Sequence, residues 1–327
     1  MNYYKRTADA LLQDLLDAFG AVLIEGPKWC GKTTTASQLA NSILRMQDPS
    51  MREEYLATAK TKPSILLKGD TPRLIDEWQD APMLWDAVRT TVDDRQIPGQ
   101  FILTGSNAVD KSQIHHSGAG RIARLRMLPM SLWESQESTG EVSLKELFNN
   151  PDYDIDGKMS KMTVEDLIFA ASRGGWPASL LARTPKAQLL VAKNYVQTIC
   201  SDDVSGIDGK KRDAKLTSMI LRAYARNVST LVKKKSLLDD VTSSGEVSCH
   251  VDTFDDYVSA LEKLFVIQNI SAWCPAIRSK TAIRSSVKRC FCDPSIPIAL
   301  LGLSPESLSM QLRTFGFIFE QMCIRDL

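Results

Sequence analysis

The sequence contains the stretch Gly26-Pro27-Lys28-Trp29-Cys30-Gly31-Lys32-Thr33, which matches the pattern G-x-x-x-x-G-K-[ST] at every fixed position. The apolar run 21–24 precedes it and is expected to form a strand, and a helix is expected from about 32 to 40. A glycine-rich turn between a strand and a helix points successive backbone N–H groups and the positive end of the helix dipole at one place. This stretch therefore predicts a phosphate-binding loop in an α/β fold.

The side chains of this loop suit a nucleoside triphosphate and magnesium. Lys32 supplies a positive charge for the β- and γ-phosphates, the Thr33 hydroxyl is a hard oxygen ligand suited to Mg²⁺, and Thr34 is placed to reach the α-phosphate. Trp29 is expected to cover the nucleotide or to pack on a neighbour. Cys30 either fills the loop as a small residue or acts as a redox-sensitive thiol at the start of a helix. We therefore expect ATP to bind through Gly26, Pro27, Lys28, Trp29, Cys30, Gly31, Lys32, Thr33 and Thr34.

Polar residues follow two further strand candidates. The short apolar run 74–75 is followed by Asp76 and Glu77. Asp76 is suited to organising Mg²⁺ together with Thr33, and Glu77 is suited to polarising a water for attack on the γ-phosphate. The alternative is an exposed carboxylate pair at the end of a strand. The run 101–104 is followed by Ser106 and Asn107, and a polar side chain here would lie between Asp76 and the loop and sense the γ-phosphate. Of the two, Ser106 is favoured; the alternative is an ordinary turn.

Three arginines mark the strand candidate 122–128: Arg121, Arg124 and Arg126. A guanidinium group matches the charge spread over a transferring phosphoryl group. We expect Arg121 to act on the nucleotide in trans, from a neighbouring subunit of a homo-oligomer, or in cis after domain closure. The alternative is a solvated strand face with alternating charge.

Composition limits the class of protein. The 327 residues suit about two domains, and 43% hydrophobic with 24% charged residues is ordinary for a folded chain. The net charge of +1 gives no overall attraction to nucleic acid or to an anionic membrane, so such binding needs a local patch. No apolar run approaches the roughly 18 residues of a membrane span, and the seven cysteines lack framework spacing. We expect a cytoplasmic protein with reduced thiols and no membrane contact.

Changes in pattern divide the chain. Strand and helix candidates alternate over the first part, which favours a parallel sheet covered on both faces. Acidic residues from Glu134 to Asp156 indicate a solvated connector, and helical periodicity dominates after it. We expect a P-loop core at 1–135, an acidic connector at 136–160, a helical region at 161–245, a winged-helix-like part at 246–305 and a further segment at 306–327.

Two basic patches, at 210–235 and 278–289, suggest a duplex-DNA surface. The amphipathic helix expected at 253–265, with 231–241 before it and strand-like residues after it, fits a helix-turn-helix with a wing. The second patch would then contact phosphates from the wing. The alternative is a packing module whose lysines form a solvated face.

The sequence resembles the AAA-type P-loop ATPases of bacteria and archaea whose C-terminal half is a domain of unknown function. The resemblance rests on the loop and on the stretches 71–79, 101–106, 116–121, 173–177 and 290–294. It implies an AAA- or STAND-like ATPase core, a helical and winged-helix region and, usually, a restriction-nuclease-like segment. The run 316–320 resembles the opening helix of that segment. Because no later Asp or Glu-x-Lys motif follows before Leu327, we expect a truncated segment without nuclease activity.

Three functions remain open at this point. The first is a Mg²⁺-dependent ATPase that acts as a conformational switch, with Glu77, Ser106 and Arg121 as catalytic residues. The second is an ATP-regulated DNA-binding regulator or defence component. The third is a small-molecule kinase that uses the same loop, although the adjacent Asp76 and Glu77 favour transfer to water. Three residues upstream of the core are candidates to cap the adenine: Tyr3, Tyr4 and Arg6.

Overall fold

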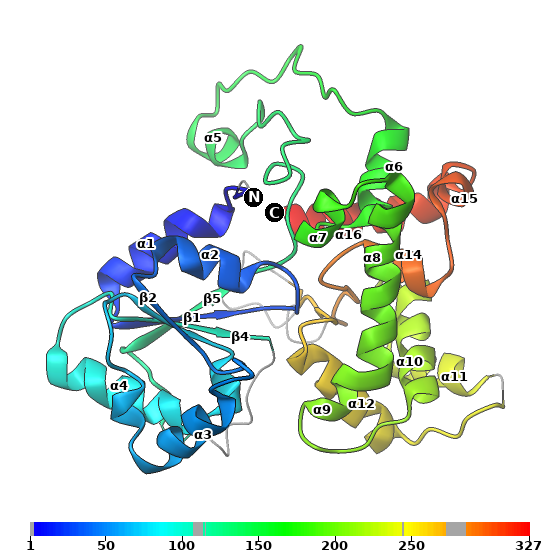
Figure 1. Cartoon of the computed structure of the whole chain (residues 1–327). Helices are drawn as coiled ribbons and strands as arrows, with labels where there is room; N and C mark the ends of the chain where they lie inside the picture. Colours follow the sequence, from blue (N-terminus) through cyan, green and yellow to red (C-terminus); the bar gives the residue numbers. More distant parts are fainter. Residues whose placement is uncertain (1–2, 107–113, 115, 244, 273–285) are drawn as a thin grey trace, which may run out of the picture.

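The computed structural model describes residues 3–106, 114, 116–243, 245–272 and 286–327. Figure 1 shows an α/β part on one side and a mostly helical part on the other. The α/β part contains one five-stranded sheet in the order β2-β3-β4-β1-β5, and every neighbouring pair is parallel. The strands are β1 (Ala21–Glu25), β2 (Ser42–Arg45), β3 (Arg73–Asp76), β4 (Phe101–Gly105) and β5 (Ile122–Arg126).

Helices cover both faces of this sheet, which confirms the predicted α/β class (Figure 1). They are α1 (Thr7–Ala18), α2 (Lys32–Leu39), α3 (Arg52–Thr61) and α4 (Met83–Arg95), with the short 3₁₀ turns η1 (Pro63–Ile65) and η2 (Trp78–Asp80). Alternate residues of β1 enter different cores: Val22 packs with Leu12 of α1, and Leu23 packs with Trp85 of α4. Because successive strand side chains point to opposite faces, each strand of this sheet contributes apolar side chains to both cores.

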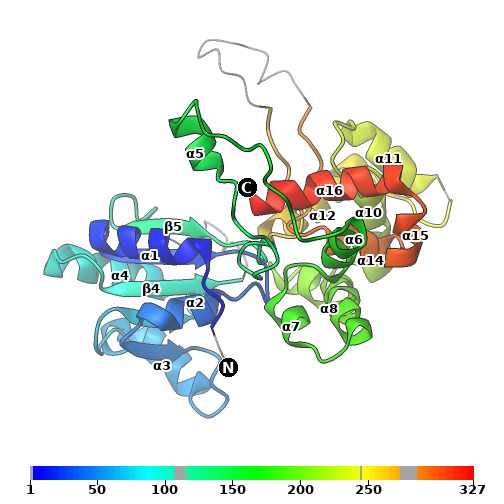
Figure 2. The same ribbon diagram turned by 90° about the horizontal axis from the view of Figure 1, so that it is seen from above.

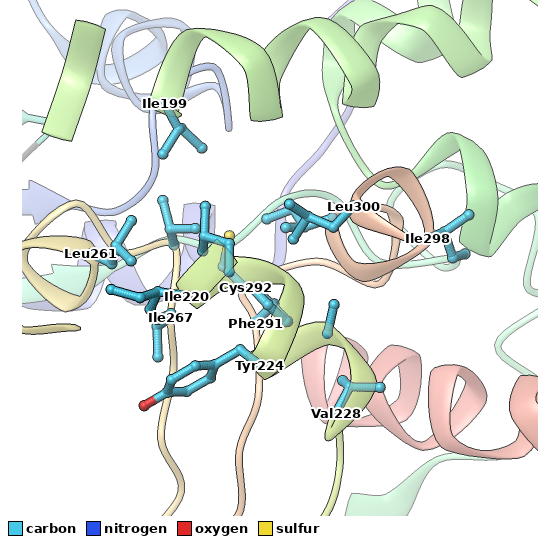
Figure 3. Close-up of a cluster of buried hydrophobic side chains, with 14 of the residues drawn as sticks. Ile199, Ile220, Tyr224, Val228, Leu261, Ile267, Phe291, Cys292, Ile298 and Leu300 are labelled. Atoms are coloured by element: carbon cyan, nitrogen blue, oxygen red, sulfur yellow. The ribbon is translucent and has the colours of Figure 1, made fainter. Parts of the chain in front are cut away.

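The helical part has its own apolar core. Its helices are α6 (Val164–Arg173), α7 (Pro177–Leu181), α8 (Pro185–Thr198), the π-helical segment η4 (Ile199–Asp203), α9 (Val204–Gly206), α10 (Ala214–Arg226), α11 (Lys234–Thr242), α12 (Val251–Lys263), α14 (Ser295–Leu300), α15 (Pro305–Ser309) and α16 (Leu312–Asp326). Figure 3 shows Tyr224 of α10 beside Phe291, edge to face at 6.3 Å between ring centroids. Segments far apart in the sequence thus share one core.

Helices α10, α11 and α12 are followed by two antiparallel bridges, Ile267 with Phe291 and Ile270 with Lys288. The winged-helix hypothesis requires this order, three helices followed by two antiparallel paired segments. The hypothesis itself stays a prediction. Most of the second basic patch lies outside the described residues, including Arg278, Lys280 and Arg284.

The connector contains α5 (Leu144–Asn149), and its first residues differ from the predicted solvated stretch. Glu134 is 4% exposed and faces Arg6, so it belongs to the interior. Burial raises the pKa of Glu134, but Arg6 and hydrogen bonds from Ser131 and Thr7 outweigh it and hold that pKa below its usual value. Glu137 receives two hydrogen bonds from Arg173 of α6, which attaches the connector to the helical part.

A close backbone approach joins the two parts of the chain. Met130 N–H donates to the Gly175 carbonyl at 2.7 Å, and a Cβ atom on Gly175 would lie 2.1 Å from the Met130 carbonyl oxygen. Only glycine fits there without a backbone shift. Seen from above in Figure 2, α16 runs across the helical part toward the connector, where Asp326 accepts a hydrogen bond from Leu132 N–H at 3.0 Å. Among the described residues, no helix has both the length and the apolarity needed to cross a membrane.

Candidate nucleotide-binding site

The loop 26–31 connects the end of β1 to the first residue of α2, as the phosphate-loop motif requires. Gly26 has φ +155° and Gly31 has φ +102°, and a Cβ atom on Gly26 would lie 2.1 Å from the Met127 carbonyl oxygen. The glycines therefore permit a path that other residues would obstruct. Lys32 is 5% exposed, and its ammonium donates to the carbonyl oxygens of Gly26 and Pro27 at 3.0 and 2.8 Å. This places a positive charge inside the curve of the loop.

Two hydroxyl groups meet one carboxylate beside the loop. Thr33 Oγ1 and Thr104 Oγ1 donate to the same oxygen of Asp76, at 2.7 and 2.6 Å. Asp76 ends β3, Thr104 lies in β4, and Thr33 begins the helix after β1. Hydroxyl and carboxylate oxygens are the donor set that Mg²⁺ accepts together with waters and substrate phosphates, so these residues fit that ion. Sequence analysis missed Thr104, although a polar residue at the end of a buried apolar run was a usable signal.

The second carboxylate, Glu77, lies in a small polar cluster. Its backbone has φ +56°, and its side chain accepts hydrogen bonds from Gln79 and, at 3.3 Å, from Ser106. The structure thus brings together two residues proposed from separate strands, Glu77 and Ser106. It adds Gln79, which sequence analysis did not select even though it lies two residues after Glu77. A carboxylate held between an amide and a hydroxyl is positioned to accept a proton from a water in the same cleft.

A cleft of about 1050 Å³ contains this cluster, and both parts of the chain line it. One wall carries the loop residues Lys28, Gly31, Lys32, Thr33 and Thr34 with Glu77, Gln79 and Ser106. The opposite wall comes from α7, α8 and η4 and includes Pro177, Leu181, Leu190, Asn194, Asp202 and Asp203. A phosphate-binding surface therefore faces a wall of apolar, amide and acidic side chains.

The variable residues of the loop contact the helical part. Lys28 Nζ donates to Asp203 at 2.6 Å, and the Trp29 ring packs on Tyr195 at 5.7 Å between centroids. Packing on a neighbour is one of the two predicted roles of Trp29; because Trp29 also lines the cleft, its role in covering the nucleotide stays a prediction. Cys30 is fully buried, with its thiol 3.8 Å from the Met127 carbonyl oxygen, as expected of a small residue that fills the loop.

Arg6 supports the loop from behind and does not cap a base. Its Nη1 donates to the Cys30 carbonyl at 2.7 Å and its Nη2 to the Leu128 carbonyl at 2.8 Å, while Glu134 lies 3.2 Å from its Nε. The guanidinium is thus enclosed on the far side of the loop, which corrects its proposed role at the adenine. The Tyr3 hydroxyl is likewise engaged, with Asp9.

Arg121 lies at the wrong edge of the sheet to serve this chain's own site. Its carbonyl accepts a hydrogen bond from Ala21 N–H, the first residue of β1, and its side chain pairs with Asp93 at 2.7 Å. The phosphate loop follows the last residue of β1, about 16 Å away for a five-residue strand. Because both ends belong to one sheet, domain closure cannot bring them together, and the proposed action in cis is wrong. Action in trans stays a prediction.

The described part of the first basic patch is largely neutralised. Five of its residues form ion pairs: Lys210 with Asp256, Arg212 with Asp208 and Asp256, Lys215 with Glu246, Arg226 with Asp240, and Lys234 with Asp255. The helix α12 contributes two of these acids, Asp255 and Asp256. A helix with an acidic face repels the phosphate backbone, which reduces the support for DNA contact here. Among described residues, no group of three or more His, Cys, Asp or Glu side chains could hold a metal.

Comparison with known proteins agrees with this geometry. Residues 18–136 match the family described as an AAA domain, and residues 164–307 match a domain of unknown function, DUF8612. The chain thus contains an AAA-type P-loop domain followed by a DUF8612 domain. The AAA domain contains the phosphate loop with Asp76, Glu77 and Ser106, and the DUF8612 domain contains the opposite wall of the cleft. The resemblance to AAA-type P-loop ATPases with a C-terminal domain of unknown function is thereby confirmed, whereas the winged helix and the nuclease-like segment stay predictions.

Three similar proteins extend over most of the chain. The uncharacterized proteins Rv2008c of Mycobacterium tuberculosis and Mb2031c of Mycobacterium bovis are each 25% identical to it over 334 residues, covering 97% of this chain and 65% of the relative. The chain thus spans less than two thirds of the length of these relatives. A Walker-type ATPase of Pyrococcus abyssi has a similar fold, with TM-score 0.52, 13% identity, and coverage of 91% of this chain and 96% of that one.

Proposed function

We propose that the AAA domain binds Mg²⁺ and ATP in the cleft and hydrolyses the nucleotide, and that the DUF8612 domain responds as a conformational switch. The observation that carries this proposal is the meeting of Thr33 and Asp76 at 2.7 Å beside a loop that holds Lys32 inside its curve. The AAA family match and the Walker-type ATPase fold support it at the level of a nucleotide-binding ATPase.

Each of these residues has a separate role in the proposed hydrolysis of ATP. Loop N–H groups and Lys32 bind the phosphates and orient the γ-phosphate toward Glu77. Glu77 accepts the proton of the attacking water, while Ser106 and Gln79 hold the carboxylate in place. Thr33 and Asp76 would hold Mg²⁺, which supplies electrophilic stabilisation of phosphate charge when it is bound. Transfer to water, and not to a small-molecule acceptor, is favoured because Glu77, which lines the cleft, directly follows Asp76 in the chain.

Calorimetry with ATP tests the binding step. Wild-type protein should release or absorb heat with ATP and Mg²⁺, and excess EDTA should weaken that binding. Asp76→Asn removes charge from the proposed metal ligand. We therefore expect the affinity for ATP to fall about tenfold when Mg²⁺ is present and to change little when it is absent. Asp94→Asn, at an exposed position of α4, is the matched control. If Asp76→Asn weakened ATP binding equally with and without Mg²⁺, the assignment of Asp76 as a metal ligand would be contradicted.

The DNA-binding alternative predicts binding that depends strongly on salt. Because five basic residues of the patch 210–235 pair with carboxylates, we expect duplex affinity to be weak and to change little when the paired lysines Lys210, Lys215 and Lys234 become glutamines. Fluorescence anisotropy with a labelled duplex at two salt concentrations measures this. A steep loss of affinity in the triple variant would favour the DNA-binding function over the simple ATPase switch.

A further inference from the structure

Lys28 ties the phosphate loop to the opposite wall of the cleft. Its Nζ lies 2.6 Å from Asp203, whose side chain is 11% exposed, while the Lys28 side chain is 42% exposed. Asp203 is the last residue of η4, the π-helical segment that continues α8. π-helical turns inside longer helices occur frequently at functional sites. The pair is therefore a direct link between the loop that would hold phosphate and one long helix of the DUF8612 domain.

The charges around this pair favour a change of partner. Lys28 and Lys32 line the cleft from the loop, whereas Asp202 and Asp203 line it from η4. A bound triphosphate brings negative charge between these walls, next to the same ammonium group that Asp203 now neutralises. Lysine is a point charge on a flexible stem, so it can rotate from one anion to another without a backbone change.

We propose that Lys28 exchanges its partner Asp203 for phosphate oxygens of ATP, and that loss of the ion pair releases η4 from the phosphate loop. This inference rests on the proposed ATP site and adds a regulatory residue pair to it. Trp29 is the next residue and packs on Tyr195, which in turn packs on Trp176 at 4.2 Å between centroids. Movement of the loop against η4 and α8 therefore reaches the interior of the DUF8612 domain.

The exchange predicts opposite effects from the two halves of one ion pair. Asp203→Asn frees Lys28 for the nucleotide, so the affinity for Mg²⁺ and ATP should rise by about threefold to tenfold. Lys28→Gln removes a phosphate contact, so affinity should fall by a similar factor, and Lys28→Arg should retain most of it. A pair that merely holds the domains together would give changes of the same sign in Asp203→Asn and Lys28→Gln.

A double-mutant cycle measured by calorimetry decides between these accounts. In the Lys28→Gln background, Asp203→Asn should no longer raise affinity, because the freed lysine is absent. Asp202→Asn is the matched control: it removes the same charge from the same wall, but the Asp202 carboxylate accepts a hydrogen bond from Ser201 and forms no ion pair with Lys28 in the described structure. Trp29 emission in the wild type should change when ATP binds, and this change should be lost in Trp29→Phe.

The possible outcomes separate this inference from the proposed function. Absence of heat from wild type with Mg²⁺ and ATP overturns both. If the wild type binds and Lys32→Ala abolishes binding, but Lys28→Gln and Asp203→Asn shift affinity in the same direction, the partner exchange alone is wrong. Equal gains in Asp202→Asn and Asp203→Asn also overturn it, since the effect would then come from the overall charge of the wall.

Discussion

Replacing Glu77 with glutamine is expected to lower steady-state phosphate release by at least about a hundredfold, the usual contribution of a general base. Glutamine has the shape of glutamate and can still contact Ser106 and Gln79, but its amide cannot accept the proton of the attacking water. The loop, Thr33 and Asp76 are untouched, so affinity for Mg²⁺ and ATP should change little. Phosphate release and calorimetry on the same preparation separate these two quantities.

Asp80→Asn provides the control for this experiment. Asp80 lines the same cleft three positions after Glu77 but pairs at 3.7 Å with Arg52 of α3. Its loss should leave turnover within about twofold, because a long ion pair with a half-exposed arginine contributes little. Unchanged turnover in Glu77→Gln would show that another group accepts the proton. A fall in affinity as large as the fall in turnover would assign Glu77 to binding.

The parts of the site that depend on local sequence could be predicted. The phosphate loop is a continuous stretch of eight residues that fixes its own strand, turn and helix. Asp76 and Ser106 follow from topology, because the carboxyl ends of parallel strands meet at one edge of a sheet. The same rule placed Arg121 at the amino end of β5, opposite the loop, so its action in cis could have been excluded from the sequence. Such reasoning fixes the edge of the sheet on which a residue lies.

The long-range contacts could not be predicted in this way. Lys28 and Asp203 are 175 positions apart, and neither has a sequence pattern that names the other. Arg6 and Glu134 likewise meet only because the connector returns behind the loop. From the sequence alone, a basic residue in a loop and an acidic residue after a helix could equally well be hydrated at the surface or paired with each other. Their pairing is decided by the packing of two domains, which a single sequence does not encode locally.

The largest effect on stability is expected at Asp293, the centre of a buried polar cluster. Asp293 is fully buried and accepts hydrogen bonds from Gly175 N–H at 2.9 Å, from Arg325 at 3.0 Å, and from the amide and hydroxyl of Ser295. Asp293→Ala leaves the Arg325 guanidinium, itself 2% exposed, without this partner. Breaking one side of a buried ion pair costs about 3–5 kcal/mol of the free energy of unfolding.

Urea unfolding followed by far-UV circular dichroism measures this loss, and an exposed pair supplies its control. Asp255 and Lys234 are joined at 2.8 Å with side chains 47% and 50% exposed, so Asp255→Ala should cost less than about 1 kcal/mol. A similar small cost for Asp293→Ala would contradict the role of the cluster. After Asp293→Ala the buried Arg325 keeps only its ion pair with Asp326, at 2.7 Å. Adding Arg325→Met removes this partly compensated charge, so Asp293→Ala/Arg325→Met should lose less stability than the sum of the single variants. Because Asp293 holds the turn that precedes α7, a wall of the cleft, Asp293→Ala should also weaken binding of ATP in protein that remains folded.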